Sequence, residues 1–310
     1  MADQTLKTLH PFLQEKDTKV SSGTVKSYSH DTGSGPVLCM VHGWPQSSYM
    51  YRHMVADLKD KITMFIPELP GYGFSSLPPK HDKRTVGSIL MEALQQVFGK
   101  ERPVIWCGHD RGGRIGHRLI VDANPSHNIQ SAIIMDIVPT REQWRVFSNP
   151  AASAAYYHWP FLAIPAAPML IEAMGPGTYI KHSLERAKGG NEVGTAKFKE
   201  NEAIAHYCHQ FSSPECIAGS CGDYAAGATE DVQEQEKDQK EGRKVKIPLL
   251  VIYSASNLGR MHDVPKVWKD WVEGELQVEG VGNGVGHYIP EEAPDEVTKL
   301  VVKWIDGQQK

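Results

Sequence analysis

Six short apolar runs, each bounded by turn-forming residues, limit the folds open to this chain more than any other feature. They lie at 36–41, 62–66, 103–107, 131–135, 248–253 and 276–281. Strands that are apolar along their whole length are typical of a parallel sheet covered on both faces. Segments with helical patterning lie between or after them, at 47–58, 85–98, 113–123, 265–272 and 292–305. This alternation predicts an α/β fold with a mostly parallel sheet flanked by helices.

Residues 140–245 break the alternation. They begin rich in Ala, Pro, His and aromatic residues, become strongly polar, and contain no apolar run that resembles a core strand. We therefore expect a helical cap inserted after the sixth core strand, which divides the core into residues 1–139 and 246–310. The charged run at 229–244 is expected to be a solvated helix or a connector back to the core.

Charge and hydropathy argue against several classes of partner. The 310 residues include 33 basic and 37 acidic ones, with a net charge of -4 and no Lys/Arg-rich run, so we expect no nucleic-acid partner. The longest mostly apolar run, 159–171, is too short to span a bilayer and contains three prolines. Residues 1–17 lack the patterns of signal and transit peptides, which predicts a cytoplasmic protein without membrane contact. Among the five cysteines, Cys39 and Cys107 lie in apolar runs and are expected to be buried free thiols.

Three chemically distinctive segments fall at the ends of predicted strands, where open α/β sheets place their ligands. They are the HGWP turn at 42–45, the CGHDRGGRIGHRL segment at 107–119, and the GVGH loop at 284–287. The order of Asp110, a second acid and His287 is that of the α/β-hydrolase triad. We assign the second acid to Asp136, because residues 254–257 offer no carboxylate and Asp263 comes late. Taken alone, an Asp at a helix start is most often a cap.

An Asp in place of the usual Ser nucleophile indicates attack on a saturated carbon. The carboxylate is already ionised at pH 7, since its reference pKa is about 3.9, and Arg111 and Arg114 would keep it so. Its product is an ester, which water deprotonated by His287 can cleave, with Asp136 orienting the imidazole. Backbone N–H groups of Trp44 and Arg111 would stabilise the oxyanion. We expect this route to need no cofactor and no metal.

The sequence resembles the haloacetate (fluoroacetate) dehalogenases of the α/β-hydrolase superfamily along nearly its whole length. The similar segments are HGWP, GYGFSS, GHDRGGR, MDIVPT, YHWPFLA, GSCGDYAAGAT and GHYIPEEAP. The chain departs from the family pattern at Ala225, where the pattern has Arg, and at Trp44, where Phe is frequent. Residues 181–194 have no match in the cap.

This resemblance implies an α/β-hydrolase fold and hydrolytic dehalogenation of a small 2-haloacid to the 2-hydroxy acid, in a homodimer. It implies that Asp110, Asp136 and His287 form the triad and that Arg111 and Arg114 bind the substrate carboxylate. It further implies a halide pocket formed by three cap side chains that carry N–H or O–H donors. These are His158, Trp159 and Tyr224.

Three other interpretations remain open. An epoxide hydrolase uses the same triad with two cap tyrosines, and candidates are Tyr156, Tyr157, Tyr179 and Tyr224; the arginine pair and the His158-Trp159 pair argue against it. A non-catalytic ligand-binding relative would normally lack a triad residue, and this chain has all three. A metal site would need ligands from His206, Cys208, His209, Cys216 and Cys221, whose spacing matches no usual zinc pattern.

Overall fold

A computed structural model describes residues 4–308 and shows an eight-stranded sheet in the order β1-β2-β4-β3-β5-β6-β7-β8. β1 pairs antiparallel with β2, and β2 with β4, while all other neighbours are parallel. Residues 1–3 and 309–310 lie outside the described residues. They belong to the two predicted core segments, and residues 1–3 also belong to the N-terminal stretch in which no signal or transit peptide was predicted. The strands are β1 Gln14–Val20, β2 Gly23–His30, β3 Val37–Val41, β4 Thr63–Pro67, β5 Val104–His109, β6 Ile129–Met135, β7 Leu249–Ser254 and β8 Leu276–Val281.

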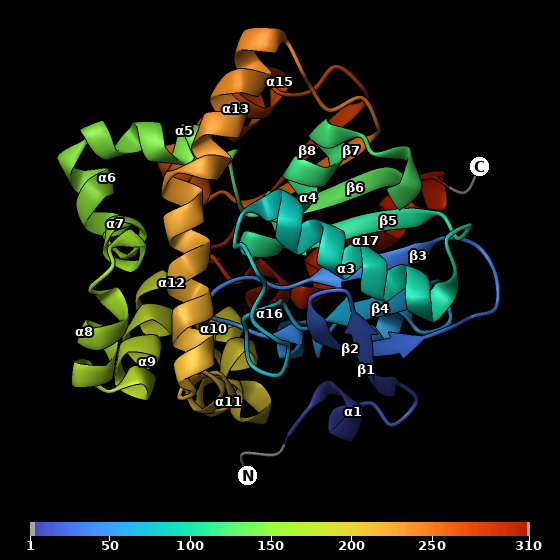
Figure 1. The fold of residues 1–310 in the computed structure, drawn as a ribbon, viewed down its shortest axis with the longest axis horizontal. Helices are drawn as coiled ribbons and strands as arrows, with labels where there is room; N and C mark the ends of the chain where they lie inside the picture. Colours follow the sequence, from blue (N-terminus) through green and yellow to red (C-terminus); the bar gives the residue numbers. More distant parts are fainter. Residues whose placement is uncertain (1–3, 309–310) are drawn as a thin grey trace.

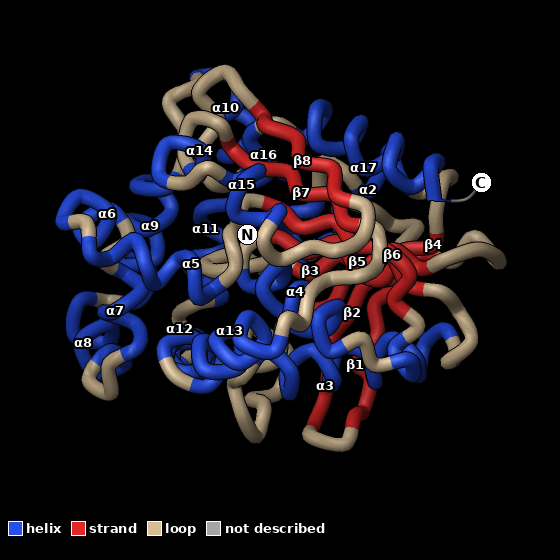
Figure 2. The backbone as a smooth tube through the Cα atoms, turned by 90° about the horizontal axis from the view of Figure 1, so that it is seen from above, coloured by secondary structure: helices blue, strands red, loops and turns tan. Residues whose placement is uncertain are grey.

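Helices cover both faces of this sheet, as Figures 1 and 2 show from two directions. α3 (Lys83–Phe98) and α4 (Arg111–Asp122) lie on one face, and α2 (Val55–Leu58) and α17 (Pro294–Gln308) lie on the other. The remaining core helices are α1 Leu6–Leu9, α14 Leu258–Met261, α15 Val264–Lys269 and α16 Ile289–Glu292. The expected mostly parallel sheet flanked by helices is confirmed.

The six apolar runs correspond to β3 through β8, but the sequence did not predict β1 and β2. β1, QEKDTKV, is largely exposed at the edge of the sheet and pairs only with β2. An exposed antiparallel edge strand is polar on its solvent side and needs no continuous apolar run. A search for buried parallel strands therefore passes over it.

The helix expected at 47–58 is wrong as a single element. The segment instead forms a 3-10 helix, Ser48–Tyr51, and the short α2. It is almost wholly buried, and the Ser48 hydroxyl donates to Glu68 at 2.5 Å while the Tyr51 hydroxyl donates to the carbonyl of Val41 at 2.8 Å. These tertiary hydrogen bonds override local helix propensity.

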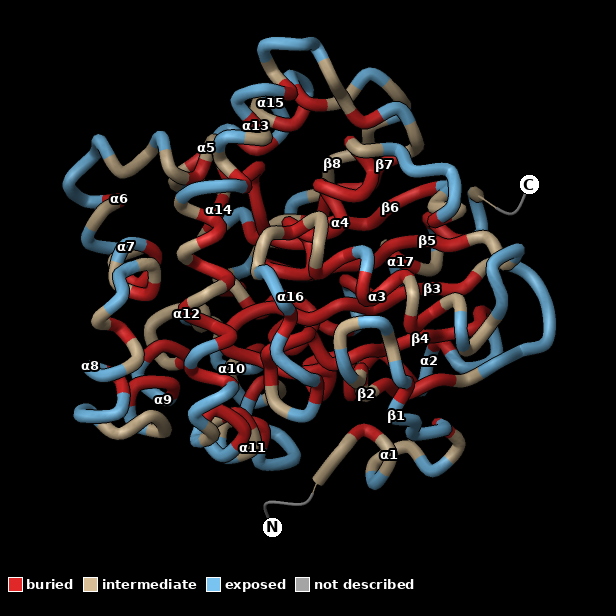
Figure 3. The backbone as a smooth tube through the Cα atoms, viewed as in Figure 1, coloured by how far each residue is buried: buried red, intermediate tan, exposed pale blue. Residues whose placement is uncertain are grey.

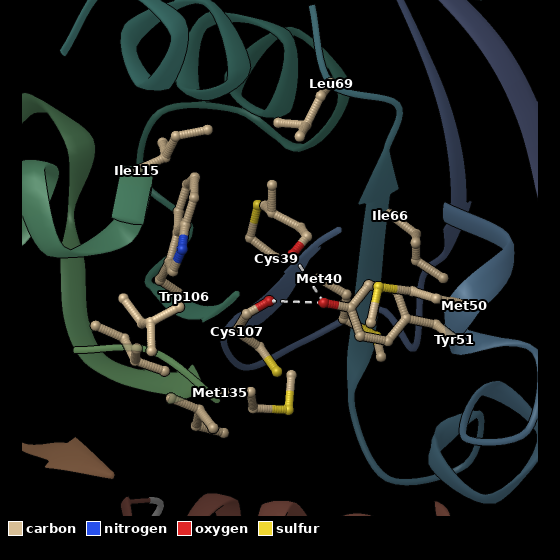
Figure 4. Packing of buried hydrophobic residues seen from close by; sticks show 14 of the residues in the cluster. Cys39, Met40, Met50, Tyr51, Ile66, Leu69, Trp106, Cys107, Ile115 and Met135 are labelled. Carbon is tan, nitrogen blue, oxygen red and sulfur yellow. Dashed lines mark hydrogen bonds between the residues drawn. The ribbon is translucent and has the colours of Figure 1, made fainter. Parts of the chain in front are cut away.

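The centre of the core lies where β3 and β5 pair. Trp106, Cys39 and Cys107 are completely buried there, and Figure 4 shows Tyr51 reaching Cys107 from the neighbouring segment. All five cysteines are free. Burial raises the pKa of the Cys107 thiol to about 12, so this thiol behaves as a small hydrophobic group.

Between β6 and β7 the chain is helical, and Figure 1 shows this cap beside the edge of the sheet, with α12 running along the boundary. Among residues 4–308, no helix is long and apolar enough to cross a membrane. The cap helices are α5 Thr140–Arg145, α6 Pro150–Ala155, α7 His158–Ala163, α8 Ala167–Met174, α9 Pro176–Ala187, α10 Glu192–Lys199, α11 Ala203–Gln210, α12 Pro214–Ala228 and α13 Glu230–Glu241.

The charged run at 229–244 forms α13, but it is not solvated all round. Asp231 and Asp238 are buried on its inner face, where Asp231 binds Lys83 at 2.9 Å and Asp238 binds Arg118 at 2.6 Å. Figure 3 shows the same contrast between a buried inner side and an exposed outer side across the cap. Buried charges require such partners, and ion pairing therefore binds this polar helix to α3 and α4.

Candidate active site

Asp110 stands at a sharp turn between β5 and α4, with φ 47° and ψ −112°. The turn is possible because the flanking glycines allow very close backbone contacts. A Cβ on Gly112 would lie 2.1 Å from the Val41 carbonyl oxygen, and one on Gly108 would lie 2.3 Å from the Gly112 oxygen. Only glycine fits at either place. The G-x-D-x-G spacing therefore serves this strand-to-helix turn, which presents Asp110 at the end of the sheet.

The structure brings His287 and Asp136 to the same place. The Nδ1 atom of His287 lies 2.6 Å from Oδ2 of Asp136, and its Nε2 atom lies 3.7 Å from Oδ2 of Asp110. The other oxygen of Asp136 accepts a hydrogen bond from the backbone N–H of Ser254 at 2.7 Å. The imidazole is thus oriented by one carboxylate and faces the other, which is the geometry of an acid–base triad.

Charges within this group shift the pKa values of its members. Burial opposes ionisation of Asp110, but His287, Arg111 and Arg114 hold its pKa below the ordinary value. Burial also disfavours a charged His287, yet the hydrogen bond and the negative charge of Asp136 raise its pKa. Asp110 is therefore a carboxylate at neutral pH, and His287 is a stronger base than a free imidazole.

The HGWP turn places a backbone donor beside Asp110. The backbone N–H of Trp44 donates to Oδ1 of Asp110 at 2.9 Å, and Gly43 approaches so closely that a Cβ there would lie 2.5 Å from the Asp110 Cβ. The backbone N–H of Arg111 makes no hydrogen bond to this carboxylate within the described residues. One of the two predicted oxyanion donors is thus already directed at Oδ1.

The loop that carries His287 is joined to the end of α9 in the cap. The backbone N–H of His287 donates to the carbonyl of Ala187 at 2.9 Å. Glu292 accepts hydrogen bonds from the N–H of Gly189 at 2.8 Å and from that of Gly286 at 2.9 Å. A Cβ on Gly286 would lie 2.1 Å from the Gly189 nitrogen, so the two backbones meet only because both residues are glycine.

A cavity of about 390 Å³ lies over the triad, between core and cap. Both parts of the molecule contribute polar and aromatic side chains to it. The core wall includes Trp44, Asp110, Arg114, Asp136, His287 and Tyr288, and the cap wall includes Gln143, Tyr156, His158, Trp159, Arg186 and Tyr224. The segment after β7 contributes Ser256, Asn257, Leu258, Arg260 and Met261.

The three predicted halide-binding side chains all line this cavity. His158 stacks on Trp44, with ring centroids 5.3 Å apart and planes 11° apart. Tyr224 meets the edges of both His158 and Trp159, at centroid distances of 5.8 Å and 5.6 Å. The three rings thus lie together in the wall that the cap contributes to the cavity.

The two predicted carboxylate-binding arginines are placed differently. Arg114 lines the cavity, where its Nη1 donates to the carbonyl of Val138 at 2.9 Å and its guanidinium lies 4.4 Å over the Trp159 ring. Burial and the charge of Arg111 lower the pKa of Arg114 to about 10, so Arg114 remains a cation. Arg114 thus brings a positive charge to the cavity wall.

The side chain of Arg111 is not among the groups that line the cavity. Its Nε and Nη2 donate to the carboxylate of Asp223 at 2.6 and 3.1 Å, and it lies 4.2 Å from the centroid of the Tyr224 ring. A fully buried guanidinium needs a carboxylate partner, and α12 supplies Asp223. Its Nη1 has no hydrogen-bond partner among the residues that the structure describes.

The tyrosines that an epoxide hydrolase would need are divided. Tyr156 and Tyr224 line the cavity above the triad. Tyr179 lines a smaller pocket behind Trp44, and Tyr157 packs under Arg186, 5.4 Å from its guanidinium. Only two of the four candidates are therefore placed near Asp110.

The predicted site lacked Asp223 and Arg186. Asp223 could have been found, since it directly precedes Tyr224 in a segment already singled out. Arg186 carries no such signal, because residues 181–194 matched no pattern.

The His/Cys cluster weighed as a metal site is dispersed. His206 stacks on Tyr49 at 4.3 Å, and Cys216 is buried beside the N–H of Gly73. Within residues 4–308, no group of three or more His, Cys, Asp or Glu side chains converges as metal ligands would.

Known proteins share this architecture. A family model described as the alpha/beta hydrolase fold matches residues 36–159. The fluoroacetate dehalogenase of Burkholderia sp. is 31% identical over 279 residues, which cover 88% of each chain. The soluble epoxide hydrolase of Corynebacterium sp. (strain C12) is 28% identical over 275 residues, which cover 88% of this chain and 91% of that protein. The solved structure of the epoxide hydrolase CorEH superposes with a TM-score of 0.81 at 25% identity, covering 96% of this chain and 99% of that one. The chain therefore belongs to the α/β-hydrolase family.

Proposed function

We propose that this hydrolase removes halide from a 2-haloacid and releases the 2-hydroxy acid. One observation carries the proposal: a single cavity contains a carboxylate nucleophile, a cation at Arg114, and the donors of His158, Trp159 and Tyr224. A negatively charged substrate with a departing anion needs such a cation and such donors. The Burkholderia fluoroacetate dehalogenase, 31% identical, supports the same assignment.

In the first step, Oδ2 of Asp110 attacks the carbon that bears the halogen. A C–O bond forms as the carbon–halogen bond breaks, and the halide leaves with the bonding electrons. Oδ1, held by the Trp44 N–H at 2.9 Å, becomes the carbonyl oxygen of the ester. Arg114 anchors the carboxylate, so that the neighbouring carbon is held in line for attack.

In the second step, water attacks the ester carbonyl carbon while His287 accepts its proton. The 2.6 Å contact with Asp136 stabilises the imidazolium that forms. As the tetrahedral intermediate collapses, the His287 imidazolium returns its proton to the departing alkoxide, which leaves as the 2-hydroxy acid. The proton that remains on the oxygen delivered by water is then lost to solvent, which restores the Asp110 carboxylate. The overall reaction consumes one water and yields one halide and one proton.

The cavity is larger than a haloacetate requires. Its volume of about 390 Å³ lies within the range of about 300–1,000 Å³ that is usual for drug-sized ligands, whereas a haloacetate has only about five non-hydrogen atoms. We therefore propose that 2-haloacids with longer side chains are accepted too.

Epoxide hydrolysis is the second candidate, because Tyr156 and Tyr224 both line the cavity and could protonate an epoxide oxygen. The 28% identical Corynebacterium enzyme gives it further support. It leaves Arg114 and the His158-Trp159 pair without a role in binding, which is why dehalogenation is preferred.

A paired assay tests the two candidates. Halide release would be measured with fluoro-, chloro- and bromoacetate and longer 2-haloacids, and diol formation with styrene oxide. In addition, the His287→Asn variant should accumulate the Asp110 ester, seen by mass spectrometry as one substrate-derived adduct. Diol without halide would replace our proposal by the epoxide reaction, and neither product, with no adduct, would reject both.

A further inference from the structure

We propose that Arg186 is a positioning residue that fixes His158 as a neutral hydrogen-bond donor, with its proton on Nε2 directed toward the halide. The inference rests on the proposed function, since it concerns the departure of the halide from the same cavity. Arg186 lies on α9, within the segment to which the sequence assigned no role.

The contact between the two side chains determines which nitrogen of His158 carries the proton. Nη2 of Arg186 lies 2.9 Å from Nδ1 of His158. A guanidinium has only donors, so Nδ1 must accept and must be unprotonated. In a neutral imidazole the proton then resides on Nε2, on the side of the ring away from Arg186.

Both partners are held in this arrangement by further contacts. Nη1 of Arg186 donates to the carbonyl of Ala155 at 2.5 Å, and the guanidinium lies 5.4 Å over the Tyr157 ring. The imidazole of His158 is stacked flat on Trp44. A ring flip of 180° would keep the stacking but would turn a C–H group toward Arg186 in place of Nδ1, so the hydrogen bond from Arg186 is what keeps the Nε2–H in one direction.

The charges around His158 favour the same neutral form. Burial and the adjacent Arg186 cation lower the pKa of His158 well below its ordinary value, with His287 and Arg111 acting in the same sense and Asp110 opposing them. A neutral His158 cannot form an ion pair with the Asp110 carboxylate. It therefore remains a donor for the substrate, and the Arg186 cation behind it favours the developing negative charge of the halide.

The first experiment reads the proton directly and does not depend on catalysis. Protein labelled with 15N-histidine would be examined near neutral pH by long-range 1H–15N correlation, with the His158 signals assigned by their loss in His158→Gln. We expect an unprotonated Nδ1 and a protonated Nε2. A proton on Nδ1, or on both nitrogens, would overturn the inference.

The second experiment compares leaving groups. Fluoride and chloride accept hydrogen bonds more strongly than bromide, so a loosened donor should slow their release most. We expect Arg186→Met to lower single-turnover halide release from fluoro- and chloroacetate by about 10- to 100-fold and from bromoacetate by only a few fold. Arg186→Gln, which keeps an N–H donor, should lose less.

The control is Arg145→Gln, which removes an exposed arginine from the cap surface and should leave all three rates unchanged. An equal loss on all three haloacetates in Arg186→Met would show a structural effect and contradict the inference, as would no loss. If the unmodified protein released no halide from any haloacid, the proposed function would fail, whereas the histidine spectrum would still decide the tautomer. The spectrum also decides it if Arg186→Met does not fold.

Discussion

The two walls of the cavity are held by different kinds of interaction. On the core wall, Asp110 and Asp136 are fixed by backbone N–H groups and by glycine turns that tolerate no side chain. On the cap wall, His158 and Tyr224 are held by ring contacts and by arginine side chains. Backbone contacts leave little freedom for substitution, whereas side-chain contacts can be exchanged one at a time. On the proposed function, we infer that the core wall performs the reaction and anchors the substrate carboxylate through Arg114, while the cap wall determines which leaving group is accepted.

The largest expected effect belongs to the core wall. Asp110→Ala should reduce halide release on the order of 10⁴-fold or more with the fold intact, because no other group can form the ester. Chloride release and circular dichroism would measure both properties. Asp122→Asn, at the other end of the same helix, is the control. Residual activity within tenfold of the unmodified protein would place the chemistry elsewhere.

Among the contacts between cap and core, the ion pairs of Asp223 should contribute most to stability. Asp223 binds the buried Arg111 and Lys83, and Lys83 also has Asp231 as a partner. Asp223→Asn therefore leaves the buried Arg111 without a carboxylate and should lower the free energy of unfolding by about 3–5 kcal/mol. Urea titration would measure it. A change below about 1 kcal/mol would mean that the two walls are not joined through this carboxylate.

Removing one donor from the cap wall should have a smaller effect that depends on the halide. Tyr224→Phe keeps the ring over Arg111 but loses the hydroxyl, and we expect about 10- to 100-fold slower halide release from chloroacetate. Hydrolysis of the ester should be unchanged, since the halide has already left. Stopped-flow measurements separate halide release from ester hydrolysis. Equal slowing of both steps would contradict the proposal that Tyr224 acts only on the departing halide.

Acidification should slow the second step through His287. The base must be neutral, so ester decay should fall about tenfold per pH unit below the pKa that His287 has in the ester. In the free protein the pKa of His287 is raised, so a histidine titration should give a midpoint above the ordinary value of about 6.5. Ester formation removes the negative charge of Asp110, one of the groups that raise this pKa. The midpoint for ester decay should therefore lie lower than that for the free protein, which the pH dependence of single turnovers and a histidine titration can compare. The opposite order would contradict the assigned roles.

The smallest effect is expected at an exposed ion pair that also links cap and core. Lys197 on α10 binds Asp295 on α17 at 2.7 Å, but the Asp295 side chain is 74% exposed. Asp295→Asn should therefore change the free energy of unfolding by less than about 1 kcal/mol. A cost similar to that of Asp223→Asn would show that burial does not distinguish the two links.

The sequence was most informative about the core wall. The buried strands of a parallel sheet are apolar throughout, so the sequence alone predicts β3 through β8. The carboxyl ends of these strands bring Asp110, Asp136 and His287 together. Those positions follow from topology alone, because loops after parallel strands meet at one edge of the sheet. The exposed hairpin of β1 and β2 gives no such signal.

The cap wall could be predicted only by resemblance, and its contacts could not. Whether Arg111 faces a substrate or Asp223 depends on how α12 packs against α4, more than 100 residues away in the chain. The role of Arg186 depends likewise on the packing of α9 against α7. The sequence pattern of a short helix of mixed polarity does not predict which other helix it will pack against.

The hydrogen bonds between the His287 loop and the end of α9 bear on how such proteins can be recombined. Gly189 and Gly286 share the carboxylate of Glu292, and their backbones touch. A chimera that exchanged residues 140–245 alone would combine α9 of another protein with the native His287 loop. The hydrogen bonds between them would be lost, and the position of His287 would be disturbed. Residues 284–292 should therefore be transplanted together with the cap, as one inherited unit.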